Sequence, residues 1–266
     1  QVWHDKFHAG ELNEAQSHFW KTKPAEELYD LENDPDEVNN LVGSADHAEV
    51  LAEMRQAHAD WSARVKDLGL LSEWEFHHRA AEAGVTPYEV GHDAKLFDQK
   101  SLFEAAQLAT SLKADDLPKI AELLSAKDSG VRYWGALGLL TQEKTGYEAG
   151  SQQLLNALED DSPIVQIIAA EALGRYGSNA DAEKALNVLI QHINPKGDTY
   201  LGIAAWNAID YLDDRAGSAA DVIATTSSNP VDPPERVGKY SVSLKTKIVS
   251  DLGFAVEKEK KKKKKN

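Results

Sequence analysis

The sequence predicts a mainly α chain: a partial α+β segment at the N-terminal end, followed by an α-solenoid of stacked helix pairs. Two observations predict the solenoid. After residue 101 the chain consists of short apolar-periodic segments separated by Asp, Ser, Gly or Pro, and part of this pattern recurs with a nearly constant step. The β contribution rests on one short alternating segment, residues 27–31.

Composition excludes several classes of protein. The chain has 266 residues, and 42% of them are hydrophobic, which is enough for a buried core. A net charge of −15 argues against a nucleic-acid-binding fold. The absence of cysteine excludes disulfides, thiolate metal sites and cysteine nucleophiles. No apolar run approaches the roughly 18 residues of a membrane-spanning helix.

The first residues have no apolar run of the kind a signal peptide carries. The chain begins at Gln1, and its single methionine, Met54, lies inside a predicted helix. We therefore expect this sequence to be the C-terminal piece of a longer protein.

The predicted elements in residues 3–41 are short. Residues 3–19 have no clean period, and Lys23-Pro24 marks a break because proline disfavours a helical residue before it. Residues 27–31 alternate polar and apolar, as a half-buried strand does. Residues 33–36 form a strong turn signal, and residues 37–41 are then expected to make a single helical turn.

A clear amphipathic helix is predicted over residues 46–68. Its apolar positions recur at three- and four-residue steps, with Ser44 or Asp46 as the N-cap and Gly69 as the stop. Residues 70–99 contain scattered Gly and Pro and predict an irregular connection. We accordingly expect a first domain at 1–80 and a linker at 81–100.

Residues 101–225 carry the repeat. Aligning Val131 with Val165 gives a step of 34, and a weaker copy at Leu201 gives a step of 36. Small residues one and two turns later let neighbouring helices approach closely, so that stacked pairs share one core. This pattern resembles HEAT repeats. About two and a half pairs are visible, near the minimum of about three that such stacks need, so either the first domain caps the array or residues 102–124 form a full repeat.

The last region, residues 226–266, is less regular. A Pro-rich turn at 227–234 precedes a predicted last helix at 237–254. The lysine run that includes residues 260–265 is expected to be disordered by composition. It is a genuine tail or an error in the sequence, and a functional polybasic arm is the least favoured alternative.

The histidines are the first candidates for chemistry. His4 and His8 are four residues apart, which on a helix places both on one face, as metal ligands require. No glutamate follows His4 to make the HExxH pattern, and surface histidines are the favoured interpretation. His77-His78 and His92 lie in the expected linker, where packing between domains is favoured over catalysis.

Other candidates are weaker still. Tyr133-Trp134 and Trp206 fall at helical repeat positions, where core packing is favoured over ligand stacking. The sequence contains neither the Gly-x-Ser-x-Gly of a serine hydrolase nor a phosphate-binding Gly-rich loop. No catalytic, cofactor-binding or metal-binding residue is therefore assigned in this chain.

One contiguous phrase, residues 19–41, carries a second resemblance. Its elements are Glu-Leu-Tyr-Asp-Leu at 27–31, Asp34-Pro35, Glu37 and Asn40-Leu41, followed by the helix that contains Met54 and Trp61. Over about residues 15–80 the chain resembles the C-terminal subdomain of the sulfatase family, in which this phrase closes a small antiparallel sheet.

The resemblance implies a parent enzyme of the alkaline-phosphatase superfamily that hydrolyses sulfate esters or sulfamates and is periplasmic or extracellular. It implies a formylglycine made from a Cys/Ser-x-Pro-x-Arg motif and a calcium ion held by Asp and Asn, all expected in a missing N-terminal catalytic domain. The nearest look-alike here, Pro234-Glu235-Arg236, has Asp232 at the nucleophile position. This chain alone is therefore expected to be inactive.

Within that interpretation the repeats shape access of a sulfated small molecule or polysaccharide, or they mediate homo-oligomerisation. The alternative, from a different class, is a non-enzymatic HEAT-like scaffold that binds proteins. In that case the similarity of residues 19–41 to sulfatases is a coincidence.

Overall fold

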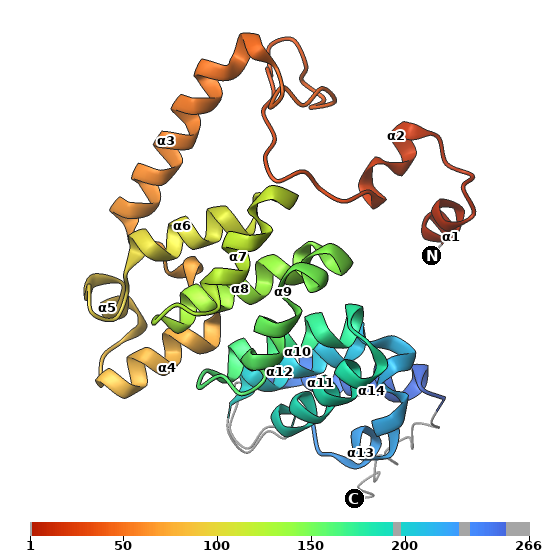
Figure 1. The fold of residues 1–266 in the computed structure, drawn as a ribbon. Helices are drawn as coiled ribbons and strands as arrows, with labels where there is room; N and C mark the ends of the chain where they lie inside the picture. The colour runs from red at the N-terminus through yellow and green to blue at the C-terminus, as the bar shows by residue number, and fades with distance from the viewer. Residues whose placement is uncertain (1, 194–197, 229–234, 254–266) are drawn as a thin grey trace, which may run out of the picture. The chain divides into compact units, whose positions relative to one another are not determined.

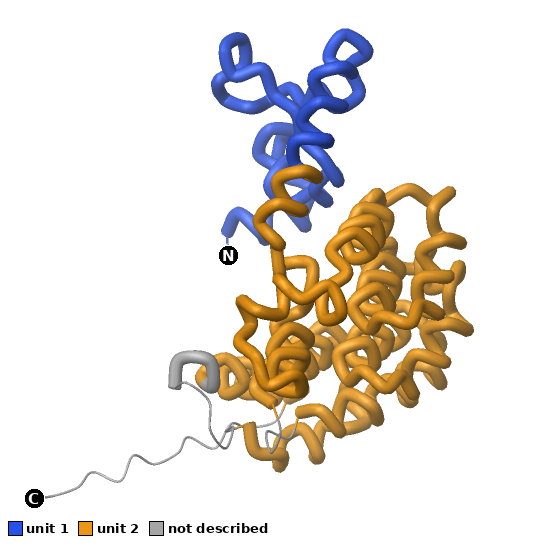
Figure 2. The backbone as a smooth tube through the Cα atoms, turned by 90° about the vertical axis from the view of Figure 1, so that its left-hand side faces the viewer, with its two compact units in different colours: residues 1–58 blue, residues 59–266 orange. Residues whose placement is uncertain are grey.

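A computed structural model describes residues 2–193, 198–228 and 235–253, and every regular element within these ranges is a helix (Figure 1). The chain divides into two compact units, residues 1–58 and residues 59–266 (Figure 2). Within the described ranges, no helix is long and apolar enough to cross a membrane.

Unit 1 begins with short helices held by aromatic rings. These are α1 (Val2–His8), α2 (Glu14–Ser17) and the 3-10 turn η1 (His18–Trp20). The rings of Trp3 and Phe19 stack at 5.1 Å, those of Phe7 and Trp20 stack at 5.9 Å, and Trp3 Nε1 donates a hydrogen bond to the Gln16 carbonyl. The sequence showed no period here because the four rings are brought together by a turn and not by one helix face.

The strand predicted at residues 27–31 is wrong for this structure, and so is the helical turn at 37–41. Residues 21–44 form a loop that its own polar groups close. The Leu28 N–H donates to Asn40 Oδ1 at 3.0 Å, and the Leu41 N–H donates to the Leu28 carbonyl at 2.7 Å. A five-residue alternation makes a strand only where a second strand supplies the ladder, and here Asn40 and Leu41 take those bonds.

The helix predicted at residues 46–68 is confirmed as α3 (Ala48–Val65), which follows the 3-10 turn η2 (Ala45–His47). It ends where Lys66 adopts a left-handed conformation with φ of 56°, before Gly69. Its apolar stripe remains exposed, with Val50 at 45% and Met54 at 57%. The amphipathic pattern therefore predicted the helix correctly but not the burial of its apolar face.

Residues 70–99 form helices where the sequence predicted an irregular linker. After the 3-10 turn η3 (Leu68–Leu70) come α4 (Glu73–Ala83) and α5 (Pro87–His92). Gly84, with φ of 67°, is the left-handed C-cap of α4, and Thr86 with Glu89 forms a capping box that starts α5. The Gly and Pro residues therefore delimit two short helices, and the division between the units lies at residues 58/59.

The predicted stack of helix pairs is confirmed. The helices are α6 (Gln99–Ala109), α7 (Leu117–Leu123), α8 (Ser129–Thr141), α9 (Glu143–Ala157), α10 (Pro163–Tyr176), α11 (Asn179–His192), α12 (Thr199–Tyr211), α13 (Ala220–Thr225) and α14 (Glu235–Asp251), with 3-10 turns η4 (Ala114–Asp116) and η5 (Asp213–Ala219). The N-cap residues of α8, α10 and α12 are Asp128, Ser162 and Asp198, which reproduce the steps of 34 and 36.

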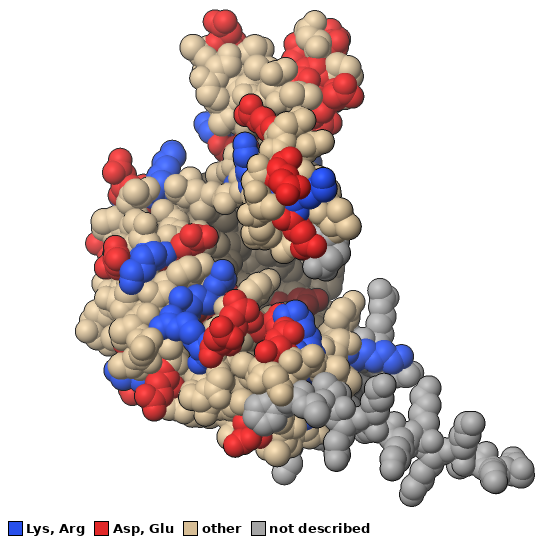
Figure 3. Space-filling view, turned by 90° about the vertical axis from the view of Figure 1, so that its right-hand side faces the viewer, with Lys and Arg blue, Asp and Glu red and all other residues tan. Residues whose placement is uncertain are grey.

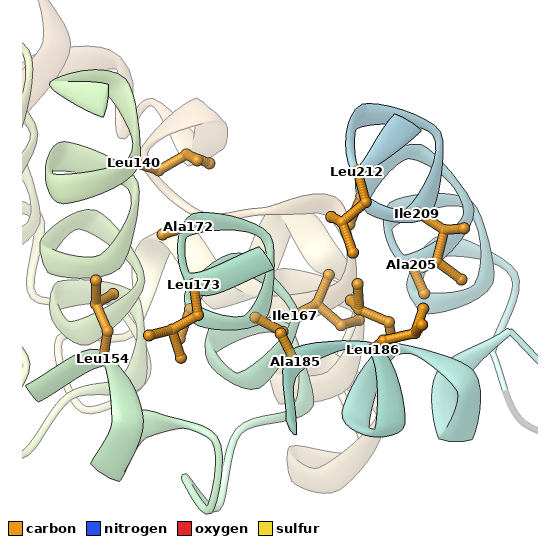
Figure 4. Close-up of a cluster of buried hydrophobic side chains, with 14 of the residues drawn as sticks. Leu140, Leu154, Ile167, Ala172, Leu173, Ala185, Leu186, Ala205, Ile209 and Leu212 are labelled. Carbon is orange, nitrogen blue, oxygen red and sulfur yellow. The ribbon is translucent and has the colours of Figure 1, made fainter. Parts of the chain in front are cut away.

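The helix pairs share one core. Leu173 of α10 lies between Leu154 of α9 and Ala185 of α11 (Figure 4), and all three side chains are 0% exposed. Trp206 of α12 is also 0% exposed, so its predicted packing role is confirmed. The last helix, predicted at 237–254, is α14; most of the Pro-rich turn and the lysine tail lie outside the described residues.

Small residues set the helix spacing in this stack, and one pair of glycines tests that constraint. A Cβ on Gly138 of α8 would meet Ile120 Cγ2 of α7 at 2.8 Å and Ala109 Cα of α6 at 2.9 Å.

We predict that Gly138→Ala lowers the free energy of unfolding by about 1–3 kcal/mol. The matched change Gly202→Ala in α12 meets no atom within 4 Å and should raise it by about 0.5–1 kcal/mol. Urea unfolding followed by circular dichroism measures both; equal effects would contradict the packing argument.

Candidate functional site

Helix α4 is held against the repeats by the buried carboxylate of Glu75, which is 3% exposed. Ser129 Oγ, at the start of α8, donates to Glu75 Oε1 at 2.6 Å, and Ser162 Oγ, the N-cap of α10, donates to Oε2 at 3.5 Å. Glu75 therefore lies at the N-termini of two neighbouring helices, where the helix dipoles favour a negative charge.

Arg79, one turn along α4, completes this attachment. Its Nε lies 2.8 Å from Glu75 Oε1, its Nη2 and Nη1 lie 2.8 and 3.1 Å from the two oxygens of Asp128, and Nη1 also donates to the Leu96 carbonyl. Burial lowers the pKa of Arg79, but the Asp128 and Glu75 carboxylates outweigh it and the net pKa is raised. The guanidinium therefore stays charged and fully engaged.

A second ion pair links consecutive repeats. Arg132 of α8 binds Asp160, which precedes α10, through two hydrogen bonds of 2.7 Å, and it also contacts Asp161. Burial raises the pKa of Asp160, but the hydrogen bonds and charge of Arg132 outweigh it, so that the pKa lies below its usual value. The cavity of about 450 Å³ bounded by Arg79 and Arg132 is thus lined by arginines that already have carboxylate partners, and we assign these groups to the architecture.

A larger groove of about 660 Å³ is the stronger candidate site. Its lining comes from the start of α4 and from α8, α10, α12 and α14, and consists of Ser72, Glu73, Trp74, Tyr133, Ile164, Ile168, Tyr200, Ile203, Ala204, Asn207 and Tyr240. The groove thus crosses the first helices of three successive pairs. Its lining is mainly aromatic and aliphatic, with a few polar groups, as ligand sites typically are.

The polar groups in this groove are available to a ligand. Within the described residues, the Asn207 amide and the Tyr240 hydroxyl have no hydrogen-bond partner, and Tyr240 is 57% exposed. Burial, and next the charge of Glu171, raise the pKa of Tyr133, so its hydroxyl remains a donor at neutral pH. Tyr200 is held by a ring stack with His77 of α4 at 5.1 Å and 10°.

The histidines considered in the sequence analysis lie in both units: His77, His78 and His92 in unit 2, and His4 and His8 in unit 1. His77 and His78 pack α4 inside unit 2, where the His78 ring stacks on Trp74 at 4.6 Å. His92 Nδ1 is hydrogen-bonded to the Tyr88 carbonyl. His4 and His8, in unit 1, bring their Nε2 atoms to 3.0 Å.

The predicted core packing is confirmed for both Tyr133 and Trp134, which pack against the two core clusters. In addition, Trp134 donates a hydrogen bond to the Leu70 carbonyl at 2.8 Å, and Tyr133 lines the groove. Sequence reasoning missed Tyr200, Asn207 and Tyr240 because they come from separate helices. What these residues share is that each is a polar or aromatic residue among the apolar positions of its helix. This common feature becomes visible only once the helices are stacked.

The sulfatase resemblance implies a calcium ion, which the sequence prediction places outside this chain. Within the described residues, no group of three or more His, Asp or Glu residues is arranged to hold a metal ion.

Comparison with known families identifies part of unit 2. Residues 117–210, from α7 into α12, match the family model for HEAT repeats. Comparison with curated proteins and comparison with solved structures each found no match. The match confirms the predicted HEAT-like repeats, and residues 15–80, which carry the sulfatase resemblance, lie wholly outside it.

The attachment of α4 predicts a large effect of one substitution. Glu75→Ala leaves Arg79 without one carboxylate and both serines without their acceptor, so we predict that the free energy of unfolding falls by about 3–5 kcal/mol. The control Glu148→Ala removes an exposed partner of Lys144 and should change it by less than about 0.5 kcal/mol. Urea unfolding measures both, and a Glu75→Ala loss as small as the control would refute this role.

Proposed function

We propose that unit 2 is a protein-binding scaffold that holds an extended, cationic segment of a partner in the groove lined by Tyr133, Tyr200 and Tyr240. The HEAT repeats support this proposal, because stacked helix pairs form extended surfaces of the kind that repeat proteins use for binding. The groove combines a defined cavity with polar groups that have no partner among the described residues.

The single observation that carries the proposal is the course of the groove across α8, α10 and α12. A ligand that contacts three successive helices has to be extended, and a peptide segment meets that requirement. Ile164, Ile168 and Ile203 offer apolar contact for its side chains. The Asn207 amide supplies one acceptor and two donors, which suit the N–H and C=O of a peptide backbone.

Charge supports a cationic ligand. Glu73 is the single charged residue in the described lining of the groove, and no Lys or Arg belongs to it. Tyrosine and tryptophan rings attract ammonium and guanidinium groups through their negative faces. The net charge of −15 would also steer a basic partner toward the chain. Over the lower part of the face shown in Figure 3, by contrast, acidic and basic side chains are interspersed.

Selection of peptides from a random display library on the full chain tests the proposal. We expect enriched peptides to carry Lys or Arg next to apolar residues. Asn207→Ala should weaken their binding about tenfold, as the loss of one good hydrogen-bonding group does, and Glu73→Lys should weaken it at least as much. The control is Tyr211→Ala, because the Tyr211 side chain is exposed (56%) and lies on α12, as Asn207 does, but outside the groove lining.

Two results would count against this function. Enrichment of acidic peptides would contradict the proposed chemistry of the ligand. Binding that survives Asn207→Ala and Glu73→Lys but is lost in Tyr211→Ala would place the binding surface elsewhere on unit 2.

A second candidate function is a contribution to a sulfatase, and the loop of unit 1 favours it. The residues that carry the resemblance are those that close this loop: the Asp34 carboxylate accepts from the Val38 and Asn39 N–H groups, and Asn40 binds Leu28. In this proposal the chain belongs to an exported enzyme acting on sulfate esters or sulfamates. Its formylglycine and calcium would come from a segment outside this chain, and the scaffold would then bind within or beside that enzyme.

The coding DNA upstream of Gln1 tests the second candidate. We predict an in-frame Cys/Ser-x-Pro-x-Arg motif within about a thousand bases, and no hydrolysis of an aryl sulfate by the purified chain. An upstream start codon without that motif would leave the scaffold as the whole function. Hydrolysis by the chain alone would show that a catalytic centre lies within it.

A further inference from the structure

A second candidate site, independent of the groove, is the histidine pair of α1. His4 and His8 lie one turn apart on the same face, and their Nε2 atoms are 3.0 Å from each other. Both residues are exposed, the side chain of His4 to 49%. Two imidazole nitrogens therefore converge on one point at the surface, where water has access.

The separation of the two nitrogens fits chelation of one ion. Histidine nitrogens bind transition metals at about 2.0–2.1 Å, so two such ligands on adjacent positions of one ion lie about 3 Å apart. Neutral imidazole carries one lone pair and one N–H. A metal can use both Nε2 lone pairs, whereas a hydrogen bond between the rings uses one of them.

The surroundings of the pair also suit a metal ligand. His4 Nδ1 lies 3.6 Å from Asp5 Oδ1, which is an ion-pair distance and longer than a hydrogen bond, so a negative charge lies beside the ring nitrogen that does not face His8. The His4 ring packs edge-on against Trp20 at 5.1 Å. Because Trp20 belongs to the aromatic cluster that holds α1, the His4 ring is positioned before any ion arrives.

We propose that His4 and His8 form a two-histidine binding site for a divalent transition-metal ion, with water completing the coordination. Imidazole suits Cu²⁺, Ni²⁺ and Zn²⁺, and Cu²⁺ binds most tightly in this series. Mg²⁺ and Ca²⁺ require oxygen ligands and are excluded. Within the described residues no third side chain joins the pair, so the site is weaker than a three- or four-ligand centre.

Calorimetric titration of the full, untagged chain with CuCl₂ and ZnCl₂ tests the site. We expect one equivalent of each ion to bind, Cu²⁺ more tightly than Zn²⁺, with MgCl₂ giving no heat of binding. His4→Gln and His8→Gln should each weaken binding at least tenfold, because either change removes the chelate. His92→Gln is the matched control, since His92 is also an exposed helix histidine but has no second histidine one turn away; it should leave the affinity unchanged.

Electron paramagnetic resonance of the Cu²⁺-loaded chain provides a readout that does not depend on stability. Coupling to two imidazole nitrogens is expected in the unsubstituted chain and to one in His8→Gln. Cu²⁺ should also quench tryptophan fluorescence, because Trp20 lies beside His4. Equal affinity in the unsubstituted chain and both glutamine variants, or a spectrum without imidazole coupling, would overturn the proposal.

Discussion

The buried carboxylate of Glu75 determines how the beginning of unit 2 meets the repeats. Burying a charge costs several kcal/mol unless partners replace its water, and the partners of Glu75 come from α4, α8 and α10. All of these partners reach the Glu75 carboxylate only when α4 lies against the N-terminal ends of α8 and α10. The electrostatic requirement of one side chain therefore positions α4, and Arg79 reinforces the same arrangement through Asp128.

The groove follows from that placement. Once Glu75 is seated, Trp74 enters the core and Ser72 to Trp74 form one edge of the cavity. The close approach of helices at small residues such as Gly138 keeps the stack tight. Corresponding faces of α8, α10 and α12 then present Tyr133, the two isoleucines of α10 and Tyr200 to the same space. The binding surface is thus a consequence of stacking and not a property of any one helix.

Unit 1 is organised differently, by local contacts. Asn40 and Asp34 close the loop of residues 21–44, and four aromatic rings hold α1 beside η1. The exposed apolar stripe of α3 shows that amphipathicity alone does not bury a helix. The scaffold and sulfatase proposals are compatible with each other, because they concern different parts of the chain.

The sequence by itself determined the repeats, the presence of α3 and α14 with their ends to within three residues, and the burial of Trp206, because periodic apolar positions and small residues express local and nearest-neighbour packing. Only the tertiary structure showed that residues 27–31 form a loop, because no second strand pairs with them in the described structure. It also showed that α4 and α5 are helices, since the Gly and Pro residues at their ends are residue types that also occur in loops. The groove likewise needed the tertiary structure, since Tyr133, Tyr200, Asn207 and Tyr240 are far apart in the chain. Their proximity depends on the stacking of α8, α12 and α14, and only the α4 edge of the groove depends on Glu75.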